Sequence, residues 1–163
     1  MKKYSREDQK SLAIWAAGCA ERVLPFFEKE YPKDERPHKA IVTCMTWVRT
    51  GVFNMADIRG ASLAAHAAAR EAKDNNAACY AARAAGQAVA TAHVPQHAFG
   101  AAYYALKAIM AADPVNAMFN VPMEFDWQSG RLAENLKEEV LKRVIVQKAG
   151  GKISIKIQKD EDY

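Results

Sequence analysis

The chain of 163 residues contains few cysteines, and their placement suits neither a metal site nor a redox pair. Cys19, Cys44 and Cys79 are odd in number, lie far apart and form no Cys-x-x-Cys motif. Each occurs in an apolar helical run, where cysteine packs as a small hydrophobic residue. This usage argues against a disulfide framework and favours the reducing cytoplasm as the setting.

The sequence also lacks an uncharged apolar run of about 20 residues, the length that a membrane-spanning helix needs. Its most apolar stretch, residues 61–112, is interrupted by charges that include Arg70, Glu71 and Arg83. The net charge of +4 is small, and basic residues alternate with acidic ones along the whole chain. Neither a membrane nor a nucleic acid is therefore expected as a partner.

Local signatures of several enzyme classes are missing as well. The chain has no Gly-x-Gly-x-x-Gly, no phosphate loop, no His-Glu-x-x-His and no Gly-x-Ser-x-Gly. No cofactor is expected from these patterns. The absence of these motifs disfavours the enzyme classes that carry them, and the function must be argued from weaker evidence.

What the sequence has in abundance is alanine, which makes up nearly half of residues 61–112. Alanine is the best helix former, and faces of alanine and glycine let helices pack closely. We predict an all-α, single-domain bundle of about six helices, with the Ala-rich fourth and fifth helices at its centre. Gly86 and Gly100 lie in these two helices, where each costs roughly 1 kcal/mol relative to alanine, which favours a role in close packing.

Several residues mark the expected helix ends. Asp34, Asn54 and the turn Asp74-Asn75-Asn76 are placed to cap the second, third and fourth helices. Pro25 is expected to kink or break the first helix, which extends to about residue 31. A corner is expected at 91–97 and the end of the fifth helix near Ala112.

The C-terminal third is expected to be less regular. Pro114, Pro122 and two asparagines predict an irregular crossover over 115–125, followed by a final helix that begins near Ser129 and ends at Ala149-Gly150-Gly151. This places the helical domain at 1–150 and a C-terminal extension at 151–163. Residues 152–159 alternate as a strand does, and a lone strand is marginal, so we expect it to be frayed or paired with a partner chain in a homo-oligomer.

Two groups of side chains are candidates for a site. His93 and His97 lie four residues apart and accompany His66 and Arg70 on another helix, but Pro95 separates the pair and no third metal ligand follows, so no metal site is predicted. Two other roles are open for these histidines. One is structural, with the side chain at a helix C-terminus or hydrogen-bonded to a carbonyl, and the other is general acid–base catalysis.

The second group consists of charged or polar residues on helices and in one turn, and its members are Asp34, Arg36, Arg70, Arg83 and Gln87. Arginines can receive a carboxylate or phosphate in bidentate fashion, or they can form salt bridges that tie loops to helix ends. Arg83 and Gln87, one turn apart, either face solvent or line a pocket.

A series of helical segments resembles the bacterial putative immunity proteins of the type-five-like class. The similar segments are 20–28, 31–40, 64–70, 84–94 and 97–107, in that order, within a likeness that runs from about residue 12 to about residue 141. The resemblance implies an all-helical cytoplasmic domain without known enzymatic activity that neutralises a toxin protein. It implies no particular toxin.

Two functions follow as hypotheses. The first is non-catalytic binding of a toxin, with the turn from Tyr31 to Pro37 as its contact, because Asp34 and Arg36 stand together there. Mimicry of a nucleic acid is disfavoured, since acidic residues cluster only at 160–162. The alternative is a small-molecule-binding protein or enzyme that uses a His/Arg-lined pocket between the Ala-rich helices.

Overall fold

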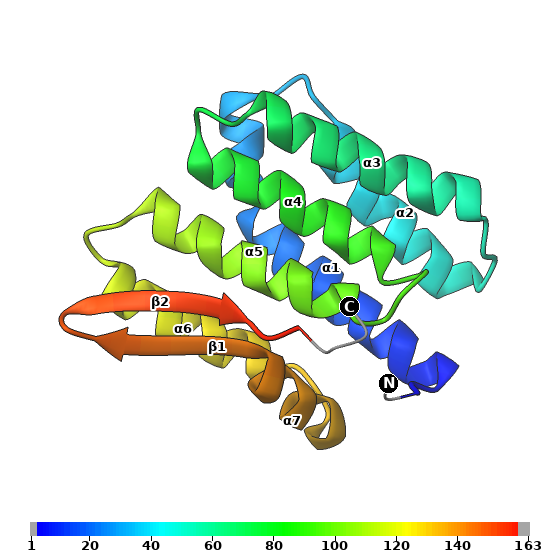
Figure 1. Ribbon diagram of the computed structural model, residues 1–163. Coiled ribbons are helices and arrows are strands. Elements are labelled where there is room, and N and C mark those ends of the chain that lie inside the picture. The colour runs from blue at the N-terminus through cyan, green and yellow to red at the C-terminus, as the bar shows by residue number, and fades with distance from the viewer. Residues whose placement is uncertain (1–2, 160–163) are drawn as a thin grey trace.

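The computed structural model describes residues 3–159, and in that range it contains seven helices and one two-stranded sheet (Figure 1). The expectation of a mainly helical protein is confirmed, whereas the purely α-helical class and the number of about six helices are wrong. The elements are α1 (Arg6–Glu30), α2 (Arg36–Thr50), α3 (Met55–Glu71), α4 (Asn76–Ala90), α5 (His97–Ala112), α6 (Ala117–Ser129), α7 (Glu134–Arg143), β1 (Val144–Ala149) and β2 (Lys152–Ile157).

The helix α4 forms the centre of the bundle, because it packs against α1, α2, α3 and α5 (Figure 1). Its alanines at 81, 82, 84, 85 and 88 are fully buried, which leaves little room for larger side chains between the helices. The side of α5 that faces away from α4 packs against α6 and the β-hairpin. The Ala-rich central helices are thus where the composition predicts them.

The starts of α3 and α4 follow the capping pattern of the sequence, whereas the residue that precedes α2 is Glu35 and not the expected Asp34. Asn54 accepts a hydrogen bond from the backbone N–H of Asp57 at 3.2 Å, and Asn75 accepts one from Ala78 at 3.0 Å. Pro25 does not break the first helix, since α1 runs from Arg6 to Glu30 without interruption. Both Pro25 and Glu21 lie on the exposed face of α1, so the carbonyl of Glu21, which loses its helical partner to proline, is open to water.

The expected irregular crossover over 115–125 is wrong, because α6 occupies most of it. The carboxylate of Asp113 holds the start of this helix by accepting hydrogen bonds from the backbone N–H of Asn116 at 3.3 Å and from its side-chain amide at 2.8 Å. Pro122 removes one backbone donor but does not end the helix. Buried residues at 117, 121, 124 and 128 form a helical stripe whose packing outweighs that loss.

The final helix is shorter than expected, and the strand after it is not alone. The helix α7 ends at Arg143, and β1 pairs with β2 antiparallel, from Val144 opposite Ile157 to Ala149 opposite Lys152. Gly150 and Gly151 form the turn with positive φ values of 58° and 72°, which glycine adopts without strain. The Gly-Gly pair is therefore a hairpin turn and not the end of a helix.

The hairpin packs on α5 and α6 within the same chain. Val144 and Ile155 supply its buried side chains, at 1% and 7% exposure. Within residues 3–159 no helix has both the length and the apolar character that crossing a bilayer requires. The acidic segment 160–162, considered above as a nucleic-acid mimic, lies outside the described residues.

Candidate functional site

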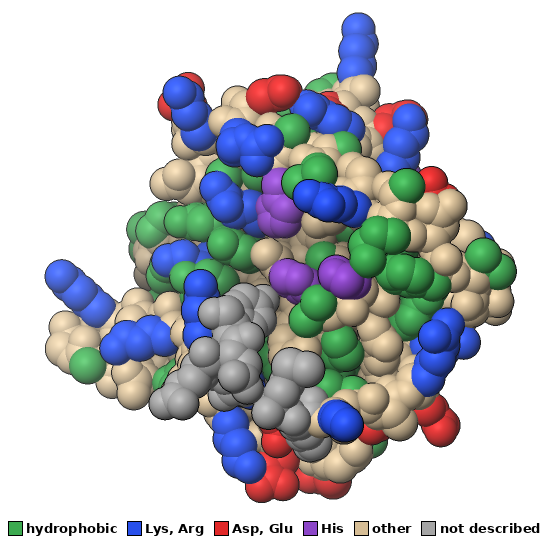
Figure 2. Space-filling view, turned by 45° about the vertical axis from the view of Figure 1, so that its right-hand side comes forward, with side chains coloured by type: hydrophobic (Ala, Val, Ile, Leu, Met, Phe, Trp, Pro, Cys, Tyr) green, Lys and Arg blue, Asp and Glu red, His purple; other side chains and the backbone are tan. Residues whose placement is uncertain are grey.

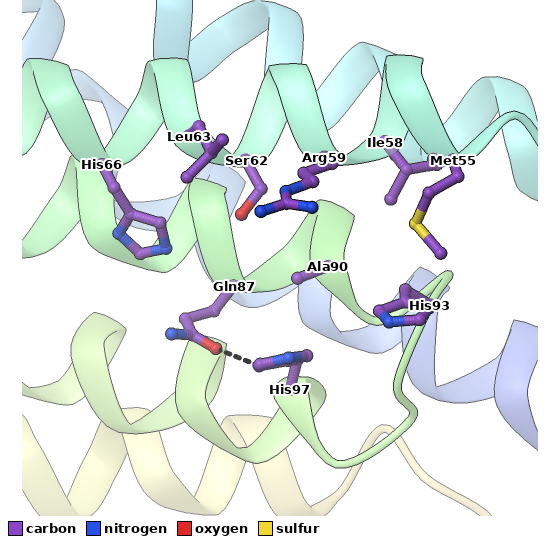
Figure 3. Close-up of a pocket in the computed structure, with 10 residues that line it drawn as sticks. All are labelled: Met55, Ile58, Arg59, Ser62, Leu63, His66, Gln87, Ala90, His93 and His97. Atoms are coloured by element: carbon purple, nitrogen blue, oxygen red, sulfur yellow. Dashed lines mark hydrogen bonds between the residues drawn. The ribbon is translucent and has the colours of Figure 1, made fainter.

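A cavity of about 300 Å³ lies where α3, α4 and the start of α5 meet (Figure 3). Four of the histidine and polar residues singled out in the sequence line it: His66 from α3, Gln87 from α4, His93 from the corner after α4, and His97 at the start of α5. The remaining lining residues are Met55, Ile58, Arg59, Ser62, Leu63 and Ala90.

The lining follows from helical periodicity. On α3 the lining positions 55, 58, 59, 62, 63 and 66 recur at intervals of three and four, so they share one face of the helix. On α4, positions 87 and 90 do the same. The turn at 91–96 then reverses the chain, which brings His93 and His97 to the same cavity although they lie on no common helix.

Two glycines, by lacking a side chain, leave room for two of the polar side chains that line the cavity. A Cβ atom at Gly86 would lie 2.8 Å from Nε2 and 2.9 Å from Cδ2 of His66, so the imidazole occupies the space that a side chain would take. A Cβ atom at Gly100 would lie 2.8 Å from Oε1 of Gln87. That same oxygen lies 2.7 Å from Nδ1 of His97 (Figure 3). The two glycines thus fix where the cavity's polar groups stand.

The cavity is electropositive. Burial lowers the pKa of His66, and the neighbouring Arg83, Arg70 and His97 lower it further. Burial also lowers the pKa of His97, with His93 adding to the effect. Of residues 3–159, no aspartate or glutamate lines the cavity. Both imidazoles are accordingly neutral at pH 7.

The histidine shifts predict that acid weakens the fold. In the unfolded chain His66 and His97 titrate near a pKa of about 6.5, above their values in the native state. The unfolded state therefore takes up protons first, and the free energy of unfolding is expected to fall as pH is lowered through about 6.5. Urea unfolding between about pH 7.5 and pH 5.5, above the range in which carboxylates titrate, measures this slope. A His66→Gln/His97→Gln variant should show a shallower slope, and an unchanged slope would contradict the assignment.

An exposed apolar surface adjoins the cavity, and we call it the apolar rim. It consists of Val52, Phe53, Met55 and Leu63, which are 72%, 41%, 43% and 55% exposed. Met55 and Leu63 also line the cavity, and the ring of Phe53 stacks on that of His93 with centroids 6.4 Å apart. Figure 2 shows histidine side chains gathered on one face, with hydrophobic and basic side chains around them and acidic ones toward the edges of the view.

Arg70 and Arg83, which the sequence analysis gives as candidate site residues, do not line the cavity. Arg70 lies exposed in the last turn of α3. Arg83 places its guanidinium 5.8 Å from the ring centroid of Tyr104, and a hydrogen bond with Cys79 raises its pKa. Of the pair one turn apart on α4, only Gln87 therefore reaches the cavity.

Asp34 and Arg36 form a separate cluster with Glu71. The Arg36 side chain bonds the Asp34 carboxylate at 2.6 Å and also pairs with Glu71 at the end of α3. This joins the turn before α2 to the C-terminal end of α3. Asp34 does not cap α2 through the usual N2 or N3 position, but its carboxylate accepts from the backbone N–H of Arg36 at 3.1 Å. The salt-bridge interpretation of this pair is confirmed.

Arg59 and Ser62 line the cavity and were not singled out in the sequence. Ser62 donates a hydrogen bond to the carbonyl of Gly86 at 3.0 Å and so ties α3 to α4. Both residues lie on the same face of α3 as His66, four and seven positions before it, so helical spacing could have identified them. In the described part of the chain, no group of three histidine, cysteine or carboxylate side chains could hold a metal ion.

The bundle and its cavity define a small, mainly α-helical protein with a concave, cationic site beside exposed apolar side chains. The chain belongs to the family of Imm-5 like putative immunity proteins, whose model matches residues 2–135. The resemblance inferred from the helical segments is thereby confirmed. The matched region contains the whole cavity and ends before the β-hairpin. No curated protein and no solved structure matches the chain.

Proposed function

We propose that this protein neutralises a toxin protein by binding it, without catalysing a reaction. The observation that carries the proposal is the match to the family of Imm-5 like putative immunity proteins over residues 2–135. An immunity protein of this kind acts in the cytoplasm of the cell that needs protection. The toxin itself is expected to be encoded by a neighbouring reading frame.

The apolar rim is the best-supported contact surface for the toxin. Contiguous apolar side chains exposed at the surface mark protein interaction sites more often than isolated ones do. Phe53 and Leu63 are 41% and 55% exposed and stand beside a concavity, which is the arrangement that interface anchors use. The turn containing Asp34 and Arg36 stays a second candidate. Its arginine is already engaged by Asp34 and Glu71, which favours a structural role.

Charge substitution in the rim is expected to abolish protection. A Phe53→Asp/Leu63→Asp variant should weaken the toxin complex by a factor of about 100 or more, because it removes two anchors and buries charge at the contact. The measurement is growth of cells that express the toxin from the neighbouring frame, together with calorimetric affinity for the purified toxin. Circular dichroism and thermal unfolding confirm that the variant is folded.

The matched control lies on α6, on the far side of α5 from α4. Phe119→Asp changes a phenylalanine that is 68% exposed and belongs to neither the cavity nor the rim. This variant should protect cells as well as the natural chain does. Full protection by the rim variant, with loss of protection in an Asp34→Ala/Arg36→Ala variant, would instead move the contact to the turn before α2.

A further inference from the structure

The cavity beside the apolar rim is lined by a cation, Arg59, that meets no counter-ion in the described part of the chain. Arg59 lines the cavity, and within residues 3–159 it makes no ion pair or hydrogen bond with another residue. In the view of Figure 3 its guanidinium extends from α3 toward Ser62, on the side of α3 that faces α4. Guanidinium groups bind carboxylates through paired, charge-assisted hydrogen bonds. An anionic ligand in this cavity would therefore give Arg59 the counter-ion that residues 3–159 do not supply there.

The histidines add donors that respond to an anion. Nδ1 of His97 lies 2.7 Å from the amide oxygen of Gln87, which only accepts, so the proton of the neutral ring resides on Nδ1. A second proton on His97 then makes Nε2 a donor as well. His66, on the opposite wall, gains a second donor in the same way when it is protonated.

Size and polarity narrow the class of ligand. About 300 Å³ is at the lower end of the roughly 300–1,000 Å³ found for small-molecule sites. Met55, Ile58, Leu63 and Ala90 make much of the lining apolar. Arg59 is the one arginine or lysine among the described residues that line the cavity, which matches a single negative charge better than a multiply charged phosphate.

We propose that this cavity binds a carboxylate carried on a small apolar group, with Arg59 as its main partner and His66 and His97 as additional donors. The carboxylate belongs either to a free organic acid or to an acidic side chain of the bound toxin. The binding chemistry is the same in both cases. This inference goes beyond neutralisation and does not depend on it.

Binding of the anion is linked to pH. Among residues 3–159, the charged or titratable groups that act on the two imidazoles are Arg70, Arg83 and His93, and Arg59 lines the same cavity; within that range none of these groups is a carboxylate. These neighbours and burial hold both histidines neutral in the empty cavity. A bound carboxylate favours their protonated forms, so the association constant should rise as pH falls from about 8 to about 6.

The experiment titrates the full chain with phenylacetate, and the uncharged phenylacetamide serves as the matched ligand control. Isothermal calorimetry measures the association constant, and histidine side-chain NMR signals report the site. Phenylacetate should bind saturably and shift the signals of His66 and His97, whereas the amide should bind at least about tenfold more weakly, as expected for loss of a charge-assisted hydrogen bond.

Two arginine variants distinguish binding in the cavity from attraction to positive charge elsewhere on the surface. Arg59→Gln should weaken phenylacetate binding by about tenfold or more, while Arg49→Gln, on α2 and outside this cavity, should leave it unchanged. Thermal unfolding confirms that both variants are folded. Equal binding of acid and amide, undiminished binding by Arg59→Gln, or the lack of saturable binding would each overturn the proposal.

Adding the toxin distinguishes the two sources of the carboxylate. If the toxin displaces phenylacetate from the cavity, the toxin supplies the acidic group. If both bind at once, the ligand is a free acid. The first titration contains no toxin, so its failure would leave neutralisation intact, and failure of neutralisation would leave the ligand result intact.

Discussion

Gly86→Leu is expected to lower the free energy of unfolding by about 1–3 kcal/mol, the usual cost of overpacking a filled interior. A side chain at this position meets the ring of His66, whose Nε2 would lie 2.8 Å from the new Cβ atom. The ring must leave its place between α3 and α4. For a domain of this size each kcal/mol lowers the melting temperature by about 2–4 °C, which thermal unfolding measures directly.

Gly60 provides the matched control for Gly86. It also lies within a helix, but a Cβ atom there would meet nothing within 4 Å. Gly60→Leu should therefore leave stability unchanged or raise it, because leucine is the better helix former. In a His66→Ala background the Gly86→Ala change should be stabilising by up to about 1 kcal/mol, since the steric conflict is gone. An equal cost of Gly86→Leu with and without His66 would contradict the packing account.

Arg22→Met is expected to destabilise the fold by about 1–3 kcal/mol. Arg22 on α1 bonds both oxygens of Glu124 on α6, at 2.6 and 2.9 Å, and its guanidinium lies 4.0 Å from the ring centroid of Trp127. Glu124 is only 7% exposed, so the change leaves a buried carboxylate without its counter-ion. The Arg22 side chain is 42% exposed, and water reduces the cost below the range of about 3–5 kcal/mol for fully buried pairs.

Replacing both Arg22 and Glu124 should lower the free energy of unfolding less than replacing the arginine alone. In an Arg22→Met/Glu124→Leu variant no charge stays buried, and apolar replacements of similar volume commonly restore stability. Urea unfolding of the single and double variants measures the coupling. If the double variant is as unstable as the sum of the two single changes, the two residues do not act as a pair.

The parts of the fold that the sequence predicted correctly depend on local signals. Asn54 and Asn75 cap helices because their side chains accept nearby backbone N–H groups, which needs no tertiary information. The parts that it missed depend on contacts far along the chain. Pro122 lies within a helix because the opposite stripe of α6 is buried, and Gly150 and Gly151 turn a hairpin because β2 packs on α5.

Part of the candidate site could be predicted from the sequence. His66 and Gln87 each pack against a glycine of the next helix, and the abundance of alanine and glycine predicts such close approach. Which way Arg70 and Arg83 point could not be deduced, because both lie on helices whose rotation is set by packing, whereas helical spacing places Arg59 on the same face of α3 as His66. Only Arg59 proved to line the cavity.

Stoichiometry tests the central claim, neutralisation by binding, most directly. The activity of a fixed amount of toxin from the neighbouring reading frame is measured while this protein is added in steps, at concentrations well above the dissociation constant. A non-catalytic inhibitor should lower toxin activity in a straight line that reaches zero at a fixed, near-equimolar ratio. Loss of all activity at a small fraction of one equivalent would show turnover and hence an enzyme, and undiminished activity in excess protein would contradict neutralisation itself.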